Sequence, residues 1–233
     1  LYRWDVMHAN DYVFWEQRIR SQLELFDLIR IDHFRGFESY WAIPSHEEHA
    51  INGCWLPGPG DTLFEKLREH LGELPLVAED LGIITDEVRA LKERQKMPGM
   101  KILQFAFSGN ADNPYLPYNH EECSVVYTGT HDNNTTVGWY DSLDEHSRSV
   151  VDDYLGQSTE KMPWPLIRSA LASCSRLAIL PMQDLLELDG GNRMNTPGTV
   201  EDNWSWRFNW EQVPSDLSDR LRQLLERYGR VNA

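Results

Sequence analysis

Acids, histidines and arginines that follow short apolar runs are the residues of this chain with the clearest potential for chemistry. The stretch LIRIDHFRGF (28–37) places Asp32 beside His33 and between two arginines. Burying a charge costs several kcal/mol unless the charge is paired, so such a cluster needs partners, a ligand or water. Similar groups follow other apolar runs: Glu79 with Asp80, Gln104, His131 with Asp132, and Gln183 with Asp184. Core packing does not require this recurrence, which therefore favours a functional interpretation.

Side-chain alternation along a strand predicts which of these groups share a face. Arg30 and Asp32 would lie on one face, where the arginine favours the ionised, oriented carboxylate that a nucleophile needs. Glu79 would share a face with Val77 in the next strand. A glutamate beside apolar walls and a second acid, here Asp80, tends to keep its proton and can act as a proton donor.

Two carboxylates in different environments, with Asp132 as a third, match the chemistry of glycoside cleavage. One acid protonates the departing oxygen while the other attacks the anomeric carbon or activates water. We expect Asp32 and Glu79 to come from neighbouring strands, roughly 5 Å apart, which favours the close spacing of retaining enzymes over the wider inverting one.

Each of these residues also has a structural interpretation. Asp32 alone is typical of a structural ion pair, and Glu79 with Asp80 could lead into a helix N-terminus, whose dipole favours acids. THDNNTT (130–136) alone resembles a polar turn. Trp41, Trp55 and Trp139, taken singly, are more typical of a core than of sugar platforms.

The same residue types could instead bind a metal ion. A barrel metallohydrolase could use the following ligands: Asp32, His33, Glu79, His131 and Asp132. Neighbouring residues of a strand point to opposite faces, however, so Asp32 and His33 do not easily converge on one ion.

The elements that must position these residues alternate between strands and helices. Short apolar runs predict five strands: 27–34, 75–82, 99–107, 123–132 and 176–185. Helices are predicted at 11–26, 62–71, 85–96, 142–155, 165–174 and 214–228, with a loop at 53–61. Capping boxes are expected from Thr62 to Glu65 and from Ser142 to Glu145, a cap at Thr85 and a stop at Gly72.

This alternation predicts an α/β fold with a parallel sheet, in which functional groups lie beyond the carboxyl ends of the strands. Five strands are too few for a closed eight-stranded barrel. A segment lacking the first three strands would fit both the count and the abrupt, aromatic-rich start LYRWDVMHAN, which has no initiator Met.

Composition narrows the classes of partner and compartment. The net charge of −15 argues against nucleic acid, because phosphate binding needs clustered Lys and Arg. No apolar run of about 18 residues is present, so we expect no membrane span. The three cysteines, Cys54, Cys123 and Cys174, have no CxxC spacing and suit reduced thiols, which favours a cytoplasmic location.

Five motifs occur in an order that resembles one known family. RIDHFRGFESYWAIP, LVAEDLG, GMKILQFAF, YTGTHDN and MNTPGT with NWSWR together resemble the amylomaltases, the 4-α-glucanotransferases or disproportionating enzymes. The resemblance implies a TIM (β/α)8 barrel of the α-amylase type. Residues 1–233 would supply roughly the last five strands, as the C-terminal part of a single catalytic domain whose first strands and inserted subdomains are absent from the chain.

The resemblance also implies roles for individual residues. Asp32 would be the nucleophile that carries the glucosyl group, Glu79 the general acid/base, and Asp132 the acid that holds sugar hydroxyls. Further substrate-binding positions would be Arg30, His33, His131, Asn133 and Trp41. Substrates would be maltooligosaccharides and α-1,4-glucans, with no metal or organic cofactor.

Two alternatives keep the same residues. The chain could belong to an α-glucan hydrolase of the same barrel class, because the residues alone do not decide between water and sugar as acceptor. It could also be an inactive sugar-binding fragment. An isolated five-strand segment would expose a sheet edge, so we expect the chain alone to have little or no activity.

Overall fold

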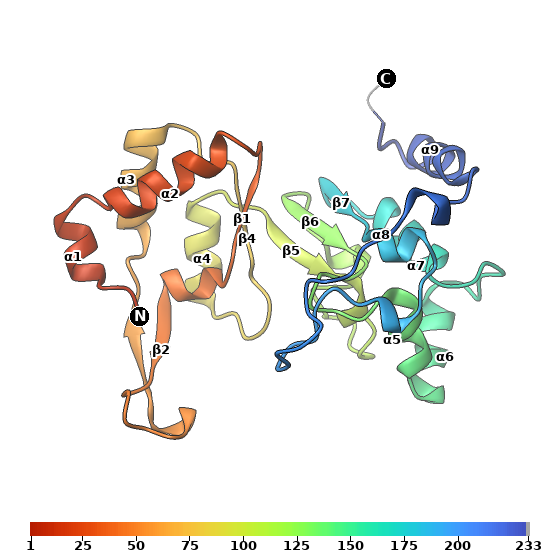
Figure 1. Cartoon of the computed structure of the whole chain (residues 1–233), viewed down its shortest axis with the longest axis horizontal. Coiled ribbons are helices and arrows are strands. Elements are labelled where there is room, and N and C mark those ends of the chain that lie inside the picture. Colours follow the sequence, from red (N-terminus) through yellow and green to blue (C-terminus); the bar gives the residue numbers. More distant parts are fainter. Residues whose placement is uncertain (232–233) are drawn as a thin grey trace. The chain divides into compact units, whose positions relative to one another are not determined.

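The computed structural model describes residues 1–231, which form two compact units: Leu1–Met100 and the part of the chain from Lys101 onward. The first unit, red to yellow in Figure 1, contains helices α1 (Trp4–Ala9), α2 (Val13–Leu23), α3 (Asp61–Leu71) and α4 (Asp86–Arg94). Its strands are β1 (Ile29–Ile31), β2 (Ser39–Ala42), β3 (Cys54–Pro57) and β4 (Leu76–Ala78).

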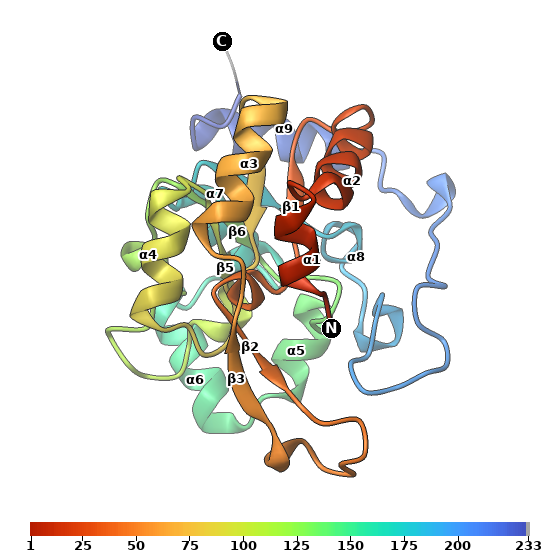
Figure 2. The same ribbon diagram turned by 90° about the vertical axis from the view of Figure 1, so that its left-hand side faces the viewer.

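Two strand pairs organise this unit. β1 and β4 are parallel, with Ile29 opposite Leu76 and Ile31 opposite Ala78. β2 and β3 are antiparallel and form a hairpin that projects away from the β1–β4 pair in both views (Figures 1 and 2). The helices cover the β1–β4 pair with apolar side chains: Trp15 and Ile19 from α2, Leu63, Phe64 and Leu67 from α3, and Val88 and Leu91 from α4.

A three-stranded sheet has the order β5 (Gly99–Ile102), β6 (Ser124–Tyr127), β7 (Leu177–Ile179). Apart from Gly99 and Met100 at the start of β5, it belongs to the second unit. β6 and β7 are parallel, with Val125 opposite Leu177. The helices of the second unit are α5 (Thr136–Ser142), α6 (Glu145–Tyr154), α7 (Trp164–Ala172), α8 (Met182–Leu185) and α9 (Leu217–Arg227). Short 3-10 turns complete the two units: η1 (Phe34–Phe37), η2 (Ala50–Asn52), η3 (Leu103–Phe105), η4 (Pro117–Asn119), η5 (Gly190–Asn192) and η6 (Trp210–Gln212).

The five predicted strands are present as β1, β4, β5, β6 and β7, but each is shorter than expected. After β1 the backbone of His33 adopts a left-handed φ of +49° and enters η1. After β5 the chain turns into η3. The strand predicted over 176–185 stops at Ile179, and Gln183 and Asp184 lie in α8 instead.

Asp184 is a structural acid. Its side chain is buried, and its carboxylate accepts hydrogen bonds from the Thr128 hydroxyl at 2.6 Å and from both the backbone N–H and the hydroxyl of Thr136 at 2.7 Å. Burial nevertheless raises the pKa of this carboxyl. Asp184 therefore links α8 to the chain that follows β6.

Both predicted capping boxes are wrong. α3 begins at Asp61, and the Thr62 hydroxyl donates backward to the Pro59 carbonyl over 2.7 Å. α6 is capped by Asp144, whose carboxylate accepts from the Ser147 N–H over 2.8 Å, while Ser142 ends the unpredicted helix α5. Aspartate and serine are equally good N-cap residues. The spacing from Ser142 to Glu145 therefore did not identify Asp144 as the cap of α6.

Other local predictions had mixed outcomes. The stop at Gly72 is confirmed by its φ of +78°, which favours glycine. The loop predicted at 53–61 instead contains β3. Within residues 1–231, no helix combines the length and the apolar character that a membrane crossing requires.

Candidate active site

Asp32 and Glu79 follow the carboxyl ends of two neighbouring parallel strands, as predicted. The pairing of β1 with β4 continues past both strands, because the Glu79 N–H donates to the Ile31 carbonyl over 3.0 Å. The Phe34 N–H donates in turn to the Glu79 carbonyl, also over 3.0 Å. Residues 32 and 79 therefore occupy equivalent positions at one edge of this pair.

The Glu79 carboxylate is oriented by the backbone. Its Oε2 accepts from the His33 N–H at 2.7 Å and its Oε1 accepts from the Leu81 N–H at 3.0 Å. The left-handed conformation of His33 follows directly on Asp32 and aims this N–H at the glutamate. The half-buried Glu79 side chain is thus held in place without a charged partner of its own among these contacts.

Asp32 is paired with Arg30, also as predicted. Arg30 Nη1 lies 2.8 Å from Asp32 Oδ1, and Arg30 Nε donates to the buried Met100 Sδ over 3.4 Å. The Asp32 side chain is 78% exposed while that of Arg30 is 30% exposed. An open carboxylate beside an anchored guanidinium is suited to attack on a bound electrophile.

A pocket of about 630 Å³ adjoins these residues in the first unit. Arg30, Asp32 and His33 contribute to its polar lining together with Arg18 and Gln22. Its aromatic lining comes from Tyr2, Trp4, Trp15, Phe37 and Tyr40. An aromatic pocket with a few convergent polar groups is typical of a small-molecule site.

Asp80, which was predicted to influence the proton of Glu79, forms an ion pair and a backbone hydrogen bond. Its carboxylate contacts Lys92 Nζ at 2.8 Å and accepts from the Met100 N–H at 2.7 Å. The Asp80 and Lys92 side chains are each only 10% exposed. A Cβ on Gly99 would lie 2.3 Å from this carboxylate, so glycine is required there. Asp80 is therefore paired with Lys92, and its influence on the proton of Glu79 stays a prediction.

Trp41 and Trp55 face each other across the β2–β3 hairpin. Their ring centroids are 5.4 Å apart at 67°, and Trp41 donates its indole N–H to the Ala50 carbonyl over 2.7 Å. The Arg35 guanidinium lies 4.3 Å from the Trp55 centroid. The two tryptophans are 37% and 51% exposed, so the interpretation of both as core residues is wrong. Trp139, in contrast, packs against a core cluster of the second unit.

In the second unit, Asp132 and His131 lie in the loop between β6 and α5. Asp132 Oδ1 accepts from Asn195 Nδ2 at 2.6 Å, and the Asp132 carbonyl accepts from Arg193 Nη2 at 2.8 Å. His131 Nε2 lies 3.5 Å from Asp132 Oδ2, and its ring packs against Trp204. The contacts of Asn195, Arg193 and Trp204 were not predicted. Asn195 and Trp204 belong to the MNTPGT and NWSWR motifs, to which no roles had been assigned.

Asn133 uses its side-chain oxygen locally. The Oδ1 atom accepts from the N–H and the hydroxyl of Thr130 at 2.9 and 2.8 Å and so closes a turn. Gln104, buried, braces the same loop by donating to the Asn134 carbonyl over 2.9 Å. A sugar contact by Asn133 stays a prediction. Across residues 1–231, no three His, Cys, Asp or Glu side chains cluster in a way that could hold a metal ion.

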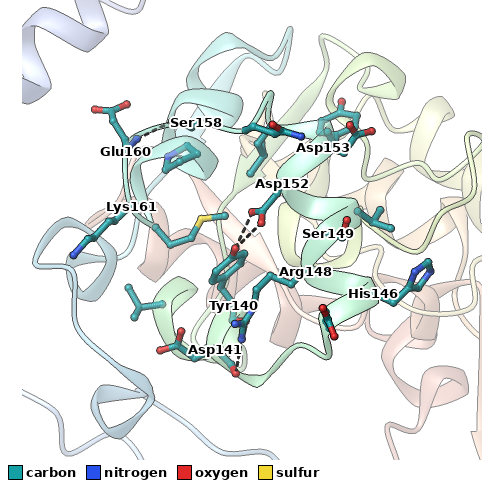
Figure 3. Close-up of a pocket in the computed structure, with 18 residues that line it drawn as sticks. Tyr140, Asp141, His146, Arg148, Ser149, Asp152, Asp153, Ser158, Glu160 and Lys161 are labelled. Carbon is teal, nitrogen blue, oxygen red and sulfur yellow. Dashed lines mark hydrogen bonds between the residues drawn. The ribbon is translucent and has the colours of Figure 1, made fainter.

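A further pocket of about 1130 Å³ lies over α5, α6 and the chain leading to α7 (Figure 3). It is lined by none of the predicted site residues. At its centre the Tyr140 hydroxyl donates to both carboxylate oxygens of Asp152, at 2.8 and 2.9 Å. Burial and this acid raise the pKa of Tyr140 to about 12, so the phenol acts here as a neutral donor that joins α5 to α6.

Parallel strands alternating with helices, with acids at neighbouring strand ends, are typical of the barrel enzymes that act on glycosides. A family model described as 4-alpha-glucanotransferase matches residues 1–213. The chain belongs to this family. It is 46% identical to a 4-alpha-glucanotransferase of Thermus thermophilus over 97% of its length, and 48% identical to one of Synechocystis sp. over 99%.

Solved structures agree with this assignment. An amylomaltase from Streptococcus agalactiae in complex with acarbose matches all of the chain with a TM-score of 0.94 and 36% identity. An amylomaltase from Corynebacterium glutamicum matches 97% of it with a TM-score of 0.73 at 18% identity, a likeness of fold alone. The predicted fold class, part of an α-amylase-type barrel, is confirmed. The chain spans about half the length of the relatives it matches, 47% of the Thermus protein and 46% of the Synechocystis protein.

Proposed function

We propose that this chain carries catalytic residues of a 4-α-glucanotransferase, which transfers a segment of a 1,4-α-glucan to another glucan or to glucose. The observation that carries the proposal is the placement of Asp32 and Glu79 at equivalent ends of the paired strands β1 and β4. Membership of the 4-alpha-glucanotransferase family supports the choice of α-glucans as substrates.

The proposed reaction is a double displacement with retention. Asp32 attacks the anomeric carbon, the bond to the glycosidic oxygen breaks, and Glu79 gives its proton to that oxygen. A hydroxyl of the acceptor sugar then loses its proton to Glu79 and attacks the same carbon, which releases Asp32. Strands about 5 Å apart suit this close pair of carboxylates.

Arg30 supports the first step because it contacts Asp32 and is itself anchored on Met100. For Asp132 we propose that it holds sugar hydroxyls, with His131 as a neighbouring sugar ligand. His33 and Trp41 are proposed as further sugar contacts, supported by the place of His33 in the lining of the aromatic pocket and by the partial exposure of Trp41. Asn133 is proposed as a sugar contact through its side-chain NH2 group, because its Oδ1 atom already accepts the hydrogen bonds of the turn.

Two further proposals concern the surroundings of the protein. We propose malto-oligosaccharides and α-1,4-glucans as its binding partners. A reducing, cytoplasm-like compartment is supported by the three free cysteines, all exposed within the described residues.

Maltotriose tests the proposed function. The chain would be assayed alone and as a chimera in which it follows the N-terminal half of the Thermus thermophilus relative. We expect the chimera to release glucose together with maltopentaose and longer products, and the chain alone to show little or no turnover. Glucose and maltose without longer products would indicate a hydrolase, and full turnover by the chain alone would contradict the expected dependence on the other half.

A further inference from the structure

Trp204 is an exposed aromatic residue held in an unusual backbone conformation. Its side chain is 55% exposed, yet its φ is +61°, a region that bulky L-residues rarely adopt. The conformation is stabilised by the Trp204 N–H, which donates to the Met194 carbonyl over 2.8 Å. The segment around it lies between η5 and η6 and contains no helix or strand (Figure 2).

Hydrogen bonds within this segment hold the backbone that carries Trp204. The Thr196 N–H donates to Asn203 Oδ1 over 2.8 Å, and Asn203 Nδ2 donates to the Thr199 carbonyl over 3.1 Å. These bonds close the loop that begins at Met194 and ends at Trp204. The ring is therefore presented to solvent by a braced loop.

The indole lies beside the acid and the imidazole of the THDN motif. Its centroid is 5.0 Å from that of His131, with 38° between the ring planes. His131 in turn lies 3.5 Å from Asp132, and Asp132 accepts from Asn195 in the same loop. The loop that ends at Trp204 thus brings an aromatic ring beside the imidazole and the carboxylate of the loop between β6 and α5.

We propose that Trp204 is a sugar-contact residue, on whose indole face a glucose ring of the α-glucan packs while its hydroxyls meet Asp132 and His131. This inference rests on the proposed function. Pyranose rings present C–H groups on their faces and hydroxyls at their edges, so an aromatic plane beside a carboxylate matches both. A loop that is already braced loses little conformational entropy on binding.

The chain offers a matched control in Trp210. It is 80% exposed, and its ring contacts Phe208 at 5.3 Å rather than the His131 imidazole. It follows Trp204 by six residues and so shares the composition of the segment. If exposure alone made a tryptophan bind sugar, Trp210 would respond more strongly than Trp204.

Fluorine NMR of the 233-residue chain carrying 5-fluorotryptophan tests the inference. Trp204→Phe and Trp210→Phe assign the two resonances, and maltoheptaose is then titrated. We expect the Trp204 resonance to shift saturably and that of Trp210 to stay in place. Calorimetry of maltoheptaose binding should show that Trp204→Ala raises Kd about tenfold. Trp204→Phe and Trp210→Ala should each raise Kd by no more than about twofold to threefold.

Three outcomes would overturn the inference. If maltoheptaose binds while the Trp204 resonance stays in place, or if Trp204→Ala binds as tightly as the unaltered chain, the sugar lies elsewhere and the proposed function is unaffected. If calorimetry detects no heat and NMR detects no shift, maltoheptaose does not bind to Trp204 in this chain. The maltotriose assay of the chimera then reports separately on the proposed function. An unchanged unfolding midpoint of Trp204→Ala would show that weaker binding is not a folding defect.

Discussion

The backbone N–H of His33 donates to Oε2 of Glu79 over 2.7 Å, which ties the residue after Asp32 to the acid that follows the neighbouring strand. One dipeptide therefore both carries the proposed nucleophile and positions the proposed acid/base. This arrangement depends on the left-handed φ of His33 and on the register of β1 with β4. The spacing of the two acids follows from strand pairing rather than from their own contacts.

Conservative replacement of either acid should remove transfer. In the chimera, Asp32→Asn removes the attacking carboxylate and should lower kcat by at least about 10³-fold. Glu79→Gln removes the proton donor and should lower kcat by about 10²–10⁴-fold. Product analysis after maltotriose incubation measures both. Retention of more than a tenth of the activity by Asp32→Asn would contradict its role as nucleophile.

Arg30→Met should lower kcat strongly while leaving the free energy of unfolding almost unchanged. The Arg30–Asp32 pair is largely solvent-exposed on the acid side, so its loss should change the free energy of unfolding by about 1 kcal/mol or less. Loss of the group that orients Asp32 should lower kcat by about 10²-fold. Urea unfolding and initial rates of the same preparation measure the two effects. A large loss of stability with little loss of rate would make Arg30 a structural residue.

Replacement of Asp80 should lower stability, whereas replacement of its neighbour Glu79 should lower kcat. Asp80→Asn leaves Lys92 without its charged partner in a buried position and should lower the free energy of unfolding by about 3–5 kcal/mol. Gly99→Ala should also destabilise, because the new Cβ would lie 2.3 Å from the Asp80 carboxylate. Chemical denaturation measures both variants. The double variant Asp80→Asn with Lys92→Met should recover part of the loss, and no recovery would argue against the ion pair as its cause.

The stability of the second unit should fall in mild acid because of His120. Burial lowers the pKa of His120, whose Nε2 lies 2.9 Å from the Tyr115 carbonyl and whose Nδ1 lies 3.1 Å from the Ser175 hydroxyl. The folded chain keeps this imidazole neutral, whereas the unfolded chain protonates it near its ordinary value of 6.5. The unfolded state then binds more protons, so stability is lost as pH falls below that value and through the lower pKa of the folded chain.

Urea unfolding at a series of pH values from 5 to 8 measures this effect. His120→Gln should be less stable at pH 8 but should show a flatter dependence on pH than the unaltered chain. His146→Gln is the matched control for the removal of a histidine, because His146 is exposed in the same unit. Parallel profiles for the unaltered chain and His120→Gln would contradict the assignment.

Local patterns predicted the elements that carry the site but not their lengths. Apolar runs located β1 and β4, and side-chain alternation correctly placed Arg30 beneath Asp32. The same alternation could not foresee that β1 would end at Ile31, because that depends on the turn at His33 and its bond to Glu79. The hairpin of β2 and β3 was missed because the Gly and Pro residues around Trp55 are typical of a loop.

The sequence alone determined the class of fold, because hydrophobic periodicity and the ordered motifs are local properties of the chain. Only the tertiary structure showed that Asp80 is paired with Lys92 instead of acting on Glu79, since that pairing depends on the fold around Lys92 and on the close approach of Gly99. It also brought Asn195 to Asp132 across 63 positions. Contacts at such separations arise from the packing of whole elements, and no spacing within a motif encodes them.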